Sequence, residues 1–265
     1  MLATIDQGSG PPVVLLHGQP GSGSSWAPVI ARIDSDFRVL APDRVGYGST
    51  GGEAMGLAGN TELVAALIRA RGASPATVVA HSWSGGVAVL LADLYPNLVK
   101  SLVLVAAACT PDSLNALDRW LNLPVVGDVL TVAGLVGIGE VFPRVRPLIR
   151  YAPSRYRDQL ATALPDRGAL GDERGALGRH KRTFMIEQQA IVEELPSVTA
   201  ALGGLELPVE VVHGGWDLVV PLRAGKSLAR AIPGAQLTIV PRAGHFVVRD
   251  DPDSLAEAIR RSAHR

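Results

Sequence analysis

The sequence has almost no cysteine and no excess charge of either sign. Cys109 is the only cysteine among the 265 residues, so the chain cannot form an internal disulfide and lacks the paired cysteines of zinc sites. Twenty-five Lys and Arg residues balance 25 Asp and Glu residues, which gives no reason to expect nucleic acid or an anionic membrane as a partner. The single cysteine fits a reducing compartment, and we expect a cytoplasmic protein.

The chain also lacks an uninterrupted hydrophobic run long enough to cross a membrane. Its most apolar segment, residues 121–141, is interrupted by Pro124, Asp128 and several glycines. Residues 1–6 contain no basic stretch followed by an apolar one, which is the pattern of a secretory signal. We therefore expect no membrane span and no secretion.

The residues that are present have the composition of a folded globular protein, with 47% hydrophobic and 19% charged residues. Short apolar segments typical of buried strands alternate with segments of helical periodicity. The expected strands are 13–16, 37–40, 77–79, 101–105, 208–213 and 236–240, and the expected helices are 26–33, 60–71, 87–95, 223–232 and 253–263. This alternation predicts an α/β fold, with an open, mostly parallel sheet of about seven strands and helices on both faces. Residues 2–5 supply one edge strand at most.

The alternation lapses between residues 111 and 204, where prolines and glycines are frequent and helix-like pieces occur at 113–121 and 181–195. We expect this segment to be a helical lid inserted after the strand at 101–105. An insertion at the carboxyl edge of an open α/β sheet lies over the crevice where such folds bind ligands. An insertion packed elsewhere with a purely structural role is the alternative.

The remaining segments, residues 1–110 and 205–265, are expected to form the core domain. Within the expected lid, residues 144–182 are locally basic. Such a run is usually a solvated face, and an acidic substrate or a partner that docks over the lid is the alternative. The pattern carries no prediction of the oligomeric state.

Ser82 lies between the expected strand at 77–79 and the expected helix at 87–95. Small residues stand two positions away on each side, Ala80 and Ser84. A serine in this setting predicts a nucleophile elbow, a sharp turn that exposes the hydroxyl and has no room for bulky flanking side chains. The usual pattern is G-x-S-x-G, and both replacements here are still small. The alternative is an ordinary turn in which serine caps the helix.

A serine nucleophile needs a base and a group that orients the base. Asp217 follows the strand at 208–213, and His245 follows the strand at 236–240. The carboxyl ends of parallel strands meet at one edge of a sheet, so we expect Ser82, Asp217 and His245 to converge there. Asp112 is a second possible acid. The alternatives are that Asp217 is a turn residue and that His245 is a surface histidine.

A tetrahedral intermediate also needs donors for its oxyanion. The backbone N–H of Trp83, directly after the serine, is one candidate at the positive end of a helix. The second is the backbone N–H of Gln19, in the loop after the first strong strand, where Gly18 and Gly21 let the backbone bend inward.

With these motifs in place, the chain resembles the α/β-hydrolase family, in its serine-nucleophile, lid-bearing esterase and haloperoxidase-like branch. The resemblance extends from residue 13 to the C-terminal helix. The matching motifs are His17-Gly18-Gln19-Pro20-Gly21, Pro42-Asp43-Arg44-Val45-Gly46-Tyr47-Gly48-Ser49, the elbow, His213-Gly214-Gly215-Trp216-Asp217 with Val220-Pro221, and Gly244-His245-Phe246. It implies a Ser82–Asp217–His245 triad, an oxyanion hole from the Gln19 and Trp83 amides, and a lid that shapes the substrate pocket.

The resemblance and the residues together predict a serine hydrolase that cleaves an apolar small-to-medium ester or related acyl compound without a cofactor or metal. Cofactor-free haloperoxidase-like enzymes and carbon–carbon bond hydrolases are alternatives within the same fold. A ligand-binding or receptor-like protein with little turnover is an alternative of another class. Residues 46–51 fit G-x-G-x-x-G, but they neither follow a strand directly nor open a helix, so we do not expect a dinucleotide site.

Overall fold

The computed structural model describes residues 2–114 and 176–265, with residues 118, 121, 130, 131, 133 and 148 between them. Seven strands form one sheet in the order β1-β3-β2-β4-β5-β6-β7. Their bounds are β1 Thr4–Gln7, β2 Pro12–Leu16, β3 Arg38–Pro42, β4 Ala76–His81, β5 Val99–Val105, β6 Val209–Gly214 and β7 Gln236–Val240. All neighbouring pairs are parallel except β1 with β3, which is antiparallel. The predicted sheet and its single N-terminal edge strand are confirmed.

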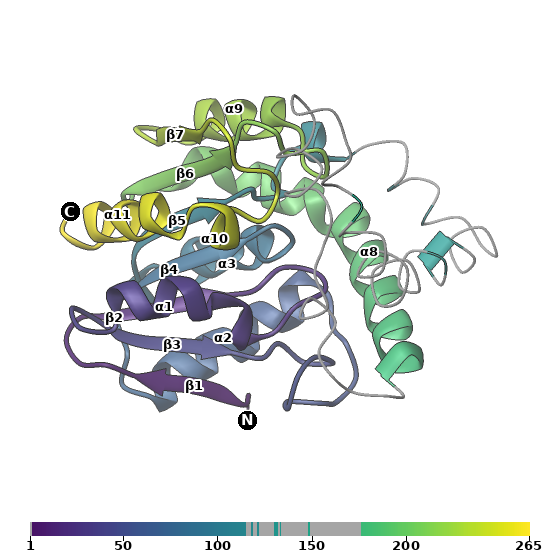
Figure 1. Ribbon diagram of the computed structural model, residues 1–265, viewed down its shortest axis with the longest axis horizontal. Helices are drawn as coiled ribbons and strands as arrows, with labels where there is room; N and C mark the ends of the chain where they lie inside the picture. Colours follow the sequence, from purple (N-terminus) through teal and green to yellow (C-terminus); the bar gives the residue numbers. More distant parts are fainter. Residues whose placement is uncertain are drawn as a thin grey trace.

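Helices cover both faces of the sheet (Figure 1). One face carries α1 Ala27–Ile33, α10 Val247–Asp250 and α11 Pro252–Ala263, and the other carries α2 Leu57–Ala70, α3 Ser84–Leu94 and α9 Leu222–Ala231. Short 3-10 turns occupy η1 Gly23–Trp26, η2 Pro96–Leu98, η3 Pro111–Ser113 and η7 Leu202–Gly204. The long helix α8 Ala176–Ala201 lies beside the carboxyl edge of the sheet.

The strand side chains alternate between two hydrophobic cores. In β2, Val14 and Leu16 pack in the core on the α2 and α3 side, whereas Val13 and Leu15 pack in the core on the α1 and α11 side. This is the alternation that a strand produces when both of its faces are covered. It explains why β2 and its neighbours appear in the sequence as continuous apolar runs.

The predicted insertion lies between two adjacent strands. β5 and β6 pair in parallel, and residues 106–208 run between them. Most of the expected lid, and with it most of the basic stretch at 144–182, lies outside the described residues. Arg182 is described, and it forms an exposed ion pair with Glu53 at 3.1 Å.

The described end of the insertion, α8, packs firmly against the sheet domain. Its buried apolar side chains belong to the core that also holds α2 and α3; they are Ala190, Ile191, Val198 and Ala201. Glu194 accepts the backbone N–H groups of Leu57 at 3.0 Å and Ala58 at 2.8 Å, which caps the N-terminus of α2.

Four predicted helix bounds need correction. The helix predicted from residue 87 begins at Ser84, and the helix predicted from residue 181 begins at Ala176. The helix predicted from residue 60 begins at Leu57, because Glu194, 137 residues away, satisfies the backbone donors of its first turn. The helix predicted to end at residue 195 continues through Pro196 to Ala201. Proline disfavours a helix interior, but here Val198 is buried in the core, and this packing favours the longer helix.

No helix within residues 2–114 and 176–265 is long and apolar enough to span a membrane. Residues 46–51 form turns and no helix begins there, since the next described helix, α2, starts at Leu57. The glycine motif therefore lacks the strand–turn–helix context of a dinucleotide site.

Candidate active site

Ser82 stands at the sharp turn between β4 and α3, as predicted for a nucleophile elbow. Its φ angle is +55°, in the left-handed region that non-glycine residues rarely adopt. The first turn of α3 also passes close to the segment after β5: a Cβ added to Gly85 would lie 2.5 Å from the Cβ of Ala107. The Ser82 backbone N–H donates to the carbonyl of Val105 on β5 at 2.9 Å, which fixes the turn against the sheet.

The structure brings Ser82, His245 and Asp217 into one hydrogen-bonded chain. The Ser82 hydroxyl lies 3.0 Å from His245 Nε2, and His245 Nδ1 lies 2.9 Å from Asp217 Oδ2. An ionised carboxylate is an acceptor, so Nδ1 carries the proton and Nε2 is free to accept from the serine. All three side chains are largely buried.

Asp217 is held by its own loop as well as by His245. Its Oδ1 atom accepts the backbone N–H groups of Val219 at 2.8 Å and Val220 at 2.9 Å. Burial raises the pKa of Asp217, but the charge and hydrogen bond of His245, with help from nearby His213 and Val220, outweigh this and lower it overall. The aspartate is therefore ionised near neutral pH and oriented toward His245.

The alternative acid, Asp112, takes a different partner. It lies in η3 on the surface, and its carboxylate accepts a hydrogen bond from the Ser227 hydroxyl. Asp217 is the aspartate in contact with His245.

The two expected oxyanion donors border Ser82. Trp83 follows it directly at the N-terminus of α3. Gly18 packs against it, since a Cβ on Gly18 would lie 3.1 Å from the Ser82 Cβ. No acceptor among residues 2–114 and 176–265 takes the backbone N–H of Gln19 or of Trp83. Both N–H groups therefore lack an acceptor in the part of the chain that the structure describes, and their role as oxyanion donors stays a prediction.

Histidines near the site are neutral and hydrogen-bonded. His17 Nε2 accepts the backbone N–H of Arg44 at 3.0 Å, and burial together with the Arg44 charge lowers the pKa of His17 well below its ordinary value. Burial and the neighbouring His245 lower the pKa of His81 to about 3. In the described part of the chain, no three His, Cys, Asp or Glu side chains come together as metal ligands would.

Sequence reasoning assigned no role to a buried ion pair beside the site. The Arg44 guanidinium and the Glu187 carboxylate of α8 are completely buried and form two hydrogen bonds with each other. The guanidinium carbon lies 4.4 Å from the Trp83 ring centre and 5.0 Å from that of Tyr47. The only sequence signal was that Arg44 belongs to one of the motifs that resemble the family, residues 42–49.

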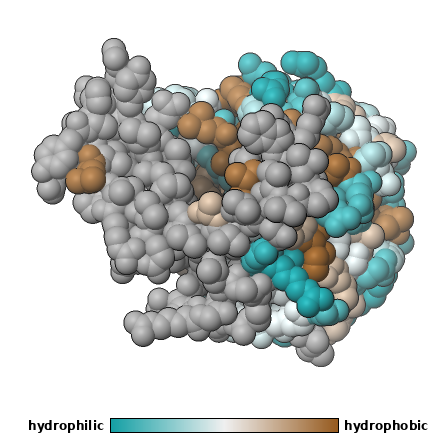
Figure 2. Space-filling model, turned by 90° about the vertical axis from the view of Figure 1, so that its right-hand side faces the viewer, coloured by the Kyte–Doolittle hydropathy of each residue, from teal (hydrophilic) through white to brown (hydrophobic). Residues whose placement is uncertain are grey.

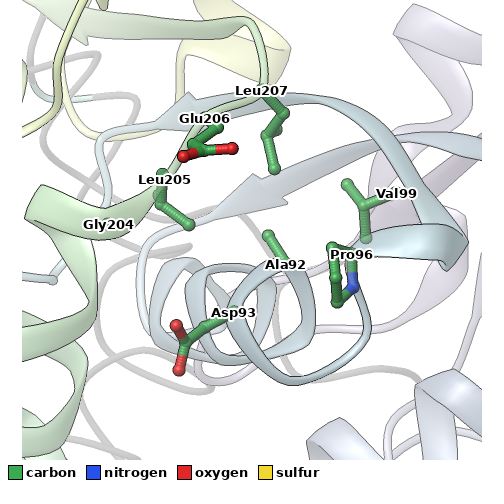
Figure 3. A pocket seen from close by; sticks show the side chains of 8 residues that line it. All are labelled: Ala92, Asp93, Pro96, Val99, Gly204, Leu205, Glu206 and Leu207. Atoms are coloured by element: carbon green, nitrogen blue, oxygen red, sulfur yellow. The ribbon is translucent and has the colours of Figure 1, made fainter.

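Figure 2 looks onto the face beside the carboxyl edge of the sheet, where hydrophobic side chains of the described residues gather toward the middle. A separate pocket of about 360 Å³ lies at the other end of α3, where Asp93, Leu205, Glu206 and Leu207 line it (Figure 3). At 1.5 Å rise per residue, the far end of α3 is about 15 Å from its start, so this pocket is distinct from the Ser82 site.

Comparison with known proteins matches residues 13–258 to the profile of the alpha/beta hydrolase family. An uncharacterized protein of Mycobacterium tuberculosis is 29% identical over 96% of this chain and 75% of its own length. A 2-hydroxymuconate semialdehyde hydrolase of Pseudomonas putida is 27% identical over 96% of this chain and 87% of its own.

Among solved structures, a thermophilic esterase from Thermogutta terrifontis superposes with a TM-score of 0.75, at 23% identity, over 100% of this chain and 94% of the esterase. At this identity the superposition shows the fold. The fold and the match over 13–258 agree with the motifs quoted from the sequence. The chain belongs to the alpha/beta hydrolase family.

Proposed function

We propose that this protein is a serine hydrolase that cleaves a small-to-medium apolar ester or related acyl compound through an acyl-enzyme. The observation that carries the proposal is the hydrogen-bonded chain from Ser82 through His245 to Asp217, with the serine on a strained turn. A hydroxyl is weakly nucleophilic by itself, and an oriented imidazole is the usual means of activating it.

In the proposed reaction the Ser82 hydroxyl oxygen attacks the substrate carbonyl carbon, and His245 Nε2 takes the hydroxyl proton. Asp217 stabilises the resulting imidazolium without itself being protonated. The Gln19 and Trp83 N–H groups donate to the oxyanion of the tetrahedral intermediate. When the intermediate collapses, His245 gives the proton to the leaving oxygen and the acyl group stays on Ser82.

Water then attacks the acyl-enzyme by the same route. His245 takes a proton from the water, the second tetrahedral intermediate forms, and its collapse returns the proton to the Ser82 oxygen and releases the acid. The cycle needs no cofactor. The apolar character of the substrate, the lid role of residues 111–204, the core domain of 1–110 and 205–265, and the cytoplasmic location stay predictions.

Hydrolysis of a carbon–carbon bond is the second candidate, favoured by the similarity to 2-hydroxymuconate semialdehyde hydrolase. The two reactions differ in the atom that leaves. An ester releases an alkoxide oxygen, whereas a carbon–carbon substrate must release a stabilised carbanion. A panel that contains both p-nitrophenyl esters of increasing chain length and 2-hydroxymuconate semialdehyde, the compound in the relative's name, separates them.

Pre-steady-state kinetics with a p-nitrophenyl ester tests the proposal. Wild-type protein is expected to give a burst of p-nitrophenol close to one equivalent of enzyme, and His245→Ala and Ser82→Ala to give none. A folded wild-type protein that binds apolar ligands but produces neither burst nor turnover with any member of the panel would favour the receptor-like alternative. Full activity of His245→Ala would refute the assignment of the base.

A further inference from the structure

The buried Arg44 guanidinium holds the loop that precedes the expected oxyanion donor. Its Nε atom donates to the carbonyl oxygen of His17 at 3.2 Å, and its Nη2 atom donates to the carbonyl oxygen of Gly18 at 3.0 Å. Two successive carbonyls of the loop therefore point at one charged group. Hydrogen bonds from a charged donor are stronger than neutral ones, and in a buried setting they fix the orientation of the acceptors.

The orientation of the Gly18 carbonyl sets the orientation of the Gln19 N–H. Both groups belong to the same peptide unit, which is planar and trans, so the N–H points opposite to the C=O. Since Arg44 binds the Gly18 oxygen, the Gln19 N–H faces away from Arg44. Gly18 itself lies against Ser82. A rotation of this peptide would turn the donor away from the position that an oxyanion takes beside the serine.

The helix α8 supports both residues that supply the expected oxyanion donors. The Gln19 side-chain amide donates to the carbonyl of Phe184 at 2.8 Å, and the Trp83 indole N–H donates to the carbonyl of Glu187 at 2.9 Å. These two carbonyls are three residues apart, on adjacent turns of α8. The loop after β2 and the start of α3 are thus tied to the same helix.

Glu187 keeps Arg44 in place. Its carboxylate pairs with both ends of the guanidinium and also accepts the Tyr47 hydroxyl at 2.8 Å. Burial raises the pKa of Glu187, and the Arg44 charge opposes that rise. Without Glu187, the guanidinium would be a buried charge whose counter-ion is missing, which is a costly state that favours rearrangement.

We propose that Arg44 is a positioning residue for the reaction: it fixes the Gly18–Gln19 peptide so that the Gln19 N–H serves the oxyanion, and Glu187 of α8 holds it there. Seating of α8 on the core is thereby coupled to formation of the oxyanion hole. This inference rests on the proposed function, because it concerns how one donor of that site is aligned.

The test uses Arg44→Lys and Glu187→Gln in the full-length protein. Lysine retains the charge but lacks the planar fork that reaches two carbonyls and a carboxylate together. Removing one oxyanion donor lowers kcat by about 100- to 1,000-fold, so we expect misalignment of one donor to lower kcat by about 10- to 100-fold. KM should change by less than about twofold, because the interaction is made in the transition state.

A vibrational readout separates alignment from general destabilisation. An acyl-enzyme is formed with a slowly deacylating ester that carries a ¹³C-labelled carbonyl, and its carbonyl stretch is measured by difference infrared spectroscopy. Hydrogen bonds to the carbonyl oxygen lower its stretching frequency. The band is expected at a higher frequency in Arg44→Lys and Glu187→Gln than in the wild type, at temperatures where circular dichroism shows each variant folded.

Arg261→Lys and Glu210→Gln are the matched controls. Glu210 is a buried carboxylate that pairs with Arg261 near the start of β6, away from the carboxyl edge that carries Ser82. These variants are expected to lose stability while the carbonyl band and kcat stay at wild-type values. If Arg44→Lys does not fold, the role of Arg44 is judged from kcat and the carbonyl band of Glu187→Gln.

The outcomes distinguish the two proposals. A wild-type protein that the ester does not acylate contradicts the proposed function, and this inference falls with it. A wild-type protein that is acylated, with folded Arg44→Lys or Glu187→Gln that keep the wild-type band and kcat, overturns the role of Arg44 alone.

Discussion

The Nε2 atom of His81 donates a hydrogen bond to the carbonyl oxygen of His245 over 2.9 Å. His81 directly precedes Ser82, so its side chain fixes the main chain of the histidine that contacts the Ser82 hydroxyl. The two imidazole rings lie 4.8 Å apart. His81 is buried, and a charged imidazolium there would face His245 and lose its hydration. Burial and the neighbouring His245 therefore require a neutral His81 in the folded protein.

This requirement predicts that acid destabilises the fold through His81. Its pKa is about 3 in the folded state and about 6.5 in an unfolded chain. Because the folded pKa is depressed, the unfolded state binds the proton more readily, so stability is complete above pH of about 6.5 and falls as the pH drops toward 3. Between pH 8 and pH 5, His81 is expected to account for a loss of about 2 kcal/mol in the free energy of unfolding.

His81→Gln keeps a donor near the position of Nε2 but cannot titrate. Its free energy of unfolding, measured by urea denaturation at pH 5 and pH 8, should depend on pH less steeply than that of the wild type by this amount. The same pH dependence in both proteins would contradict a neutral buried His81.

Asp217→Asn should leave the fold intact and sharply reduce turnover. An asparagine amide can fill the same space, but it cannot hold His245 in the tautomer that accepts the Ser82 proton. In a well-studied serine protease triad, the matching change lowers kcat by about 10⁴-fold. Asp112→Asn is the control, because Asp112 pairs with Ser227 on the surface. Steady-state ester hydrolysis with equal losses in the two variants would exclude the special role of Asp217.

Gly18→Ala should impair activity through a direct steric effect. An added Cβ would lie 2.7 Å from His81 Nδ1 and 3.1 Å from the Ser82 Cβ, so the loop or the elbow must move. Displacement of a reacting group by about 1 Å can cost about 100-fold in rate, and we expect kcat to fall by about 10- to 100-fold. Gly203→Ala, whose Cβ would meet nothing within 4 Å, should keep wild-type kcat. Equal kcat values for the two variants would show that the Gly18 loop moves to accommodate the added methyl group without disturbing Ser82 and its partners.

Glu194→Gln should weaken the attachment of α8 to the N-terminus of α2. The carboxylate caps two backbone donors at the positive end of a helix, and losing its charge is expected to cost about 1 kcal/mol of unfolding free energy. Glu193→Gln changes an exposed neighbour and should stay within about 0.5 kcal/mol of the wild type. Urea denaturation followed by circular dichroism measures the free energy of unfolding of both variants. A wild-type value for Glu194→Gln would mean that the charge of the capping residue contributes no net stability.

The sheet and the convergence of Ser82, Asp217 and His245 could be predicted because each depends on local patterns. Buried parallel strands appear as apolar runs, and each of the three residues lies in the loop or turn that follows such a run, so their meeting at the carboxyl edge follows from the topology. The elbow was predictable for the same reason, since the small residues Ala80 and Ser84 are part of the local sequence.

What could not be predicted depends on contacts between distant residues. Arg44 and Glu187 are 143 positions apart, and no local pattern links a charged residue after β3 with a glutamate on a helix of the insertion. The start of α2 was missed because its cap comes from Glu194, and the end of α8 was missed because core packing of Val198 outweighs Pro196. Each is a case in which tertiary structure overrides a local signal.

Activation of Ser82 by His245 is tested most directly by locating the site of covalent labelling by a fluorophosphonate. Wild-type protein, Ser82→Ala and His245→Ala are treated with the probe, and intact mass followed by peptide mapping locates the adduct. One adduct is expected on the peptide that contains Ser82 in the wild type, and none in either folded variant. An adduct on another residue, or labelling of Ser82 that persists at the wild-type rate in His245→Ala, would contradict activation of Ser82 by His245.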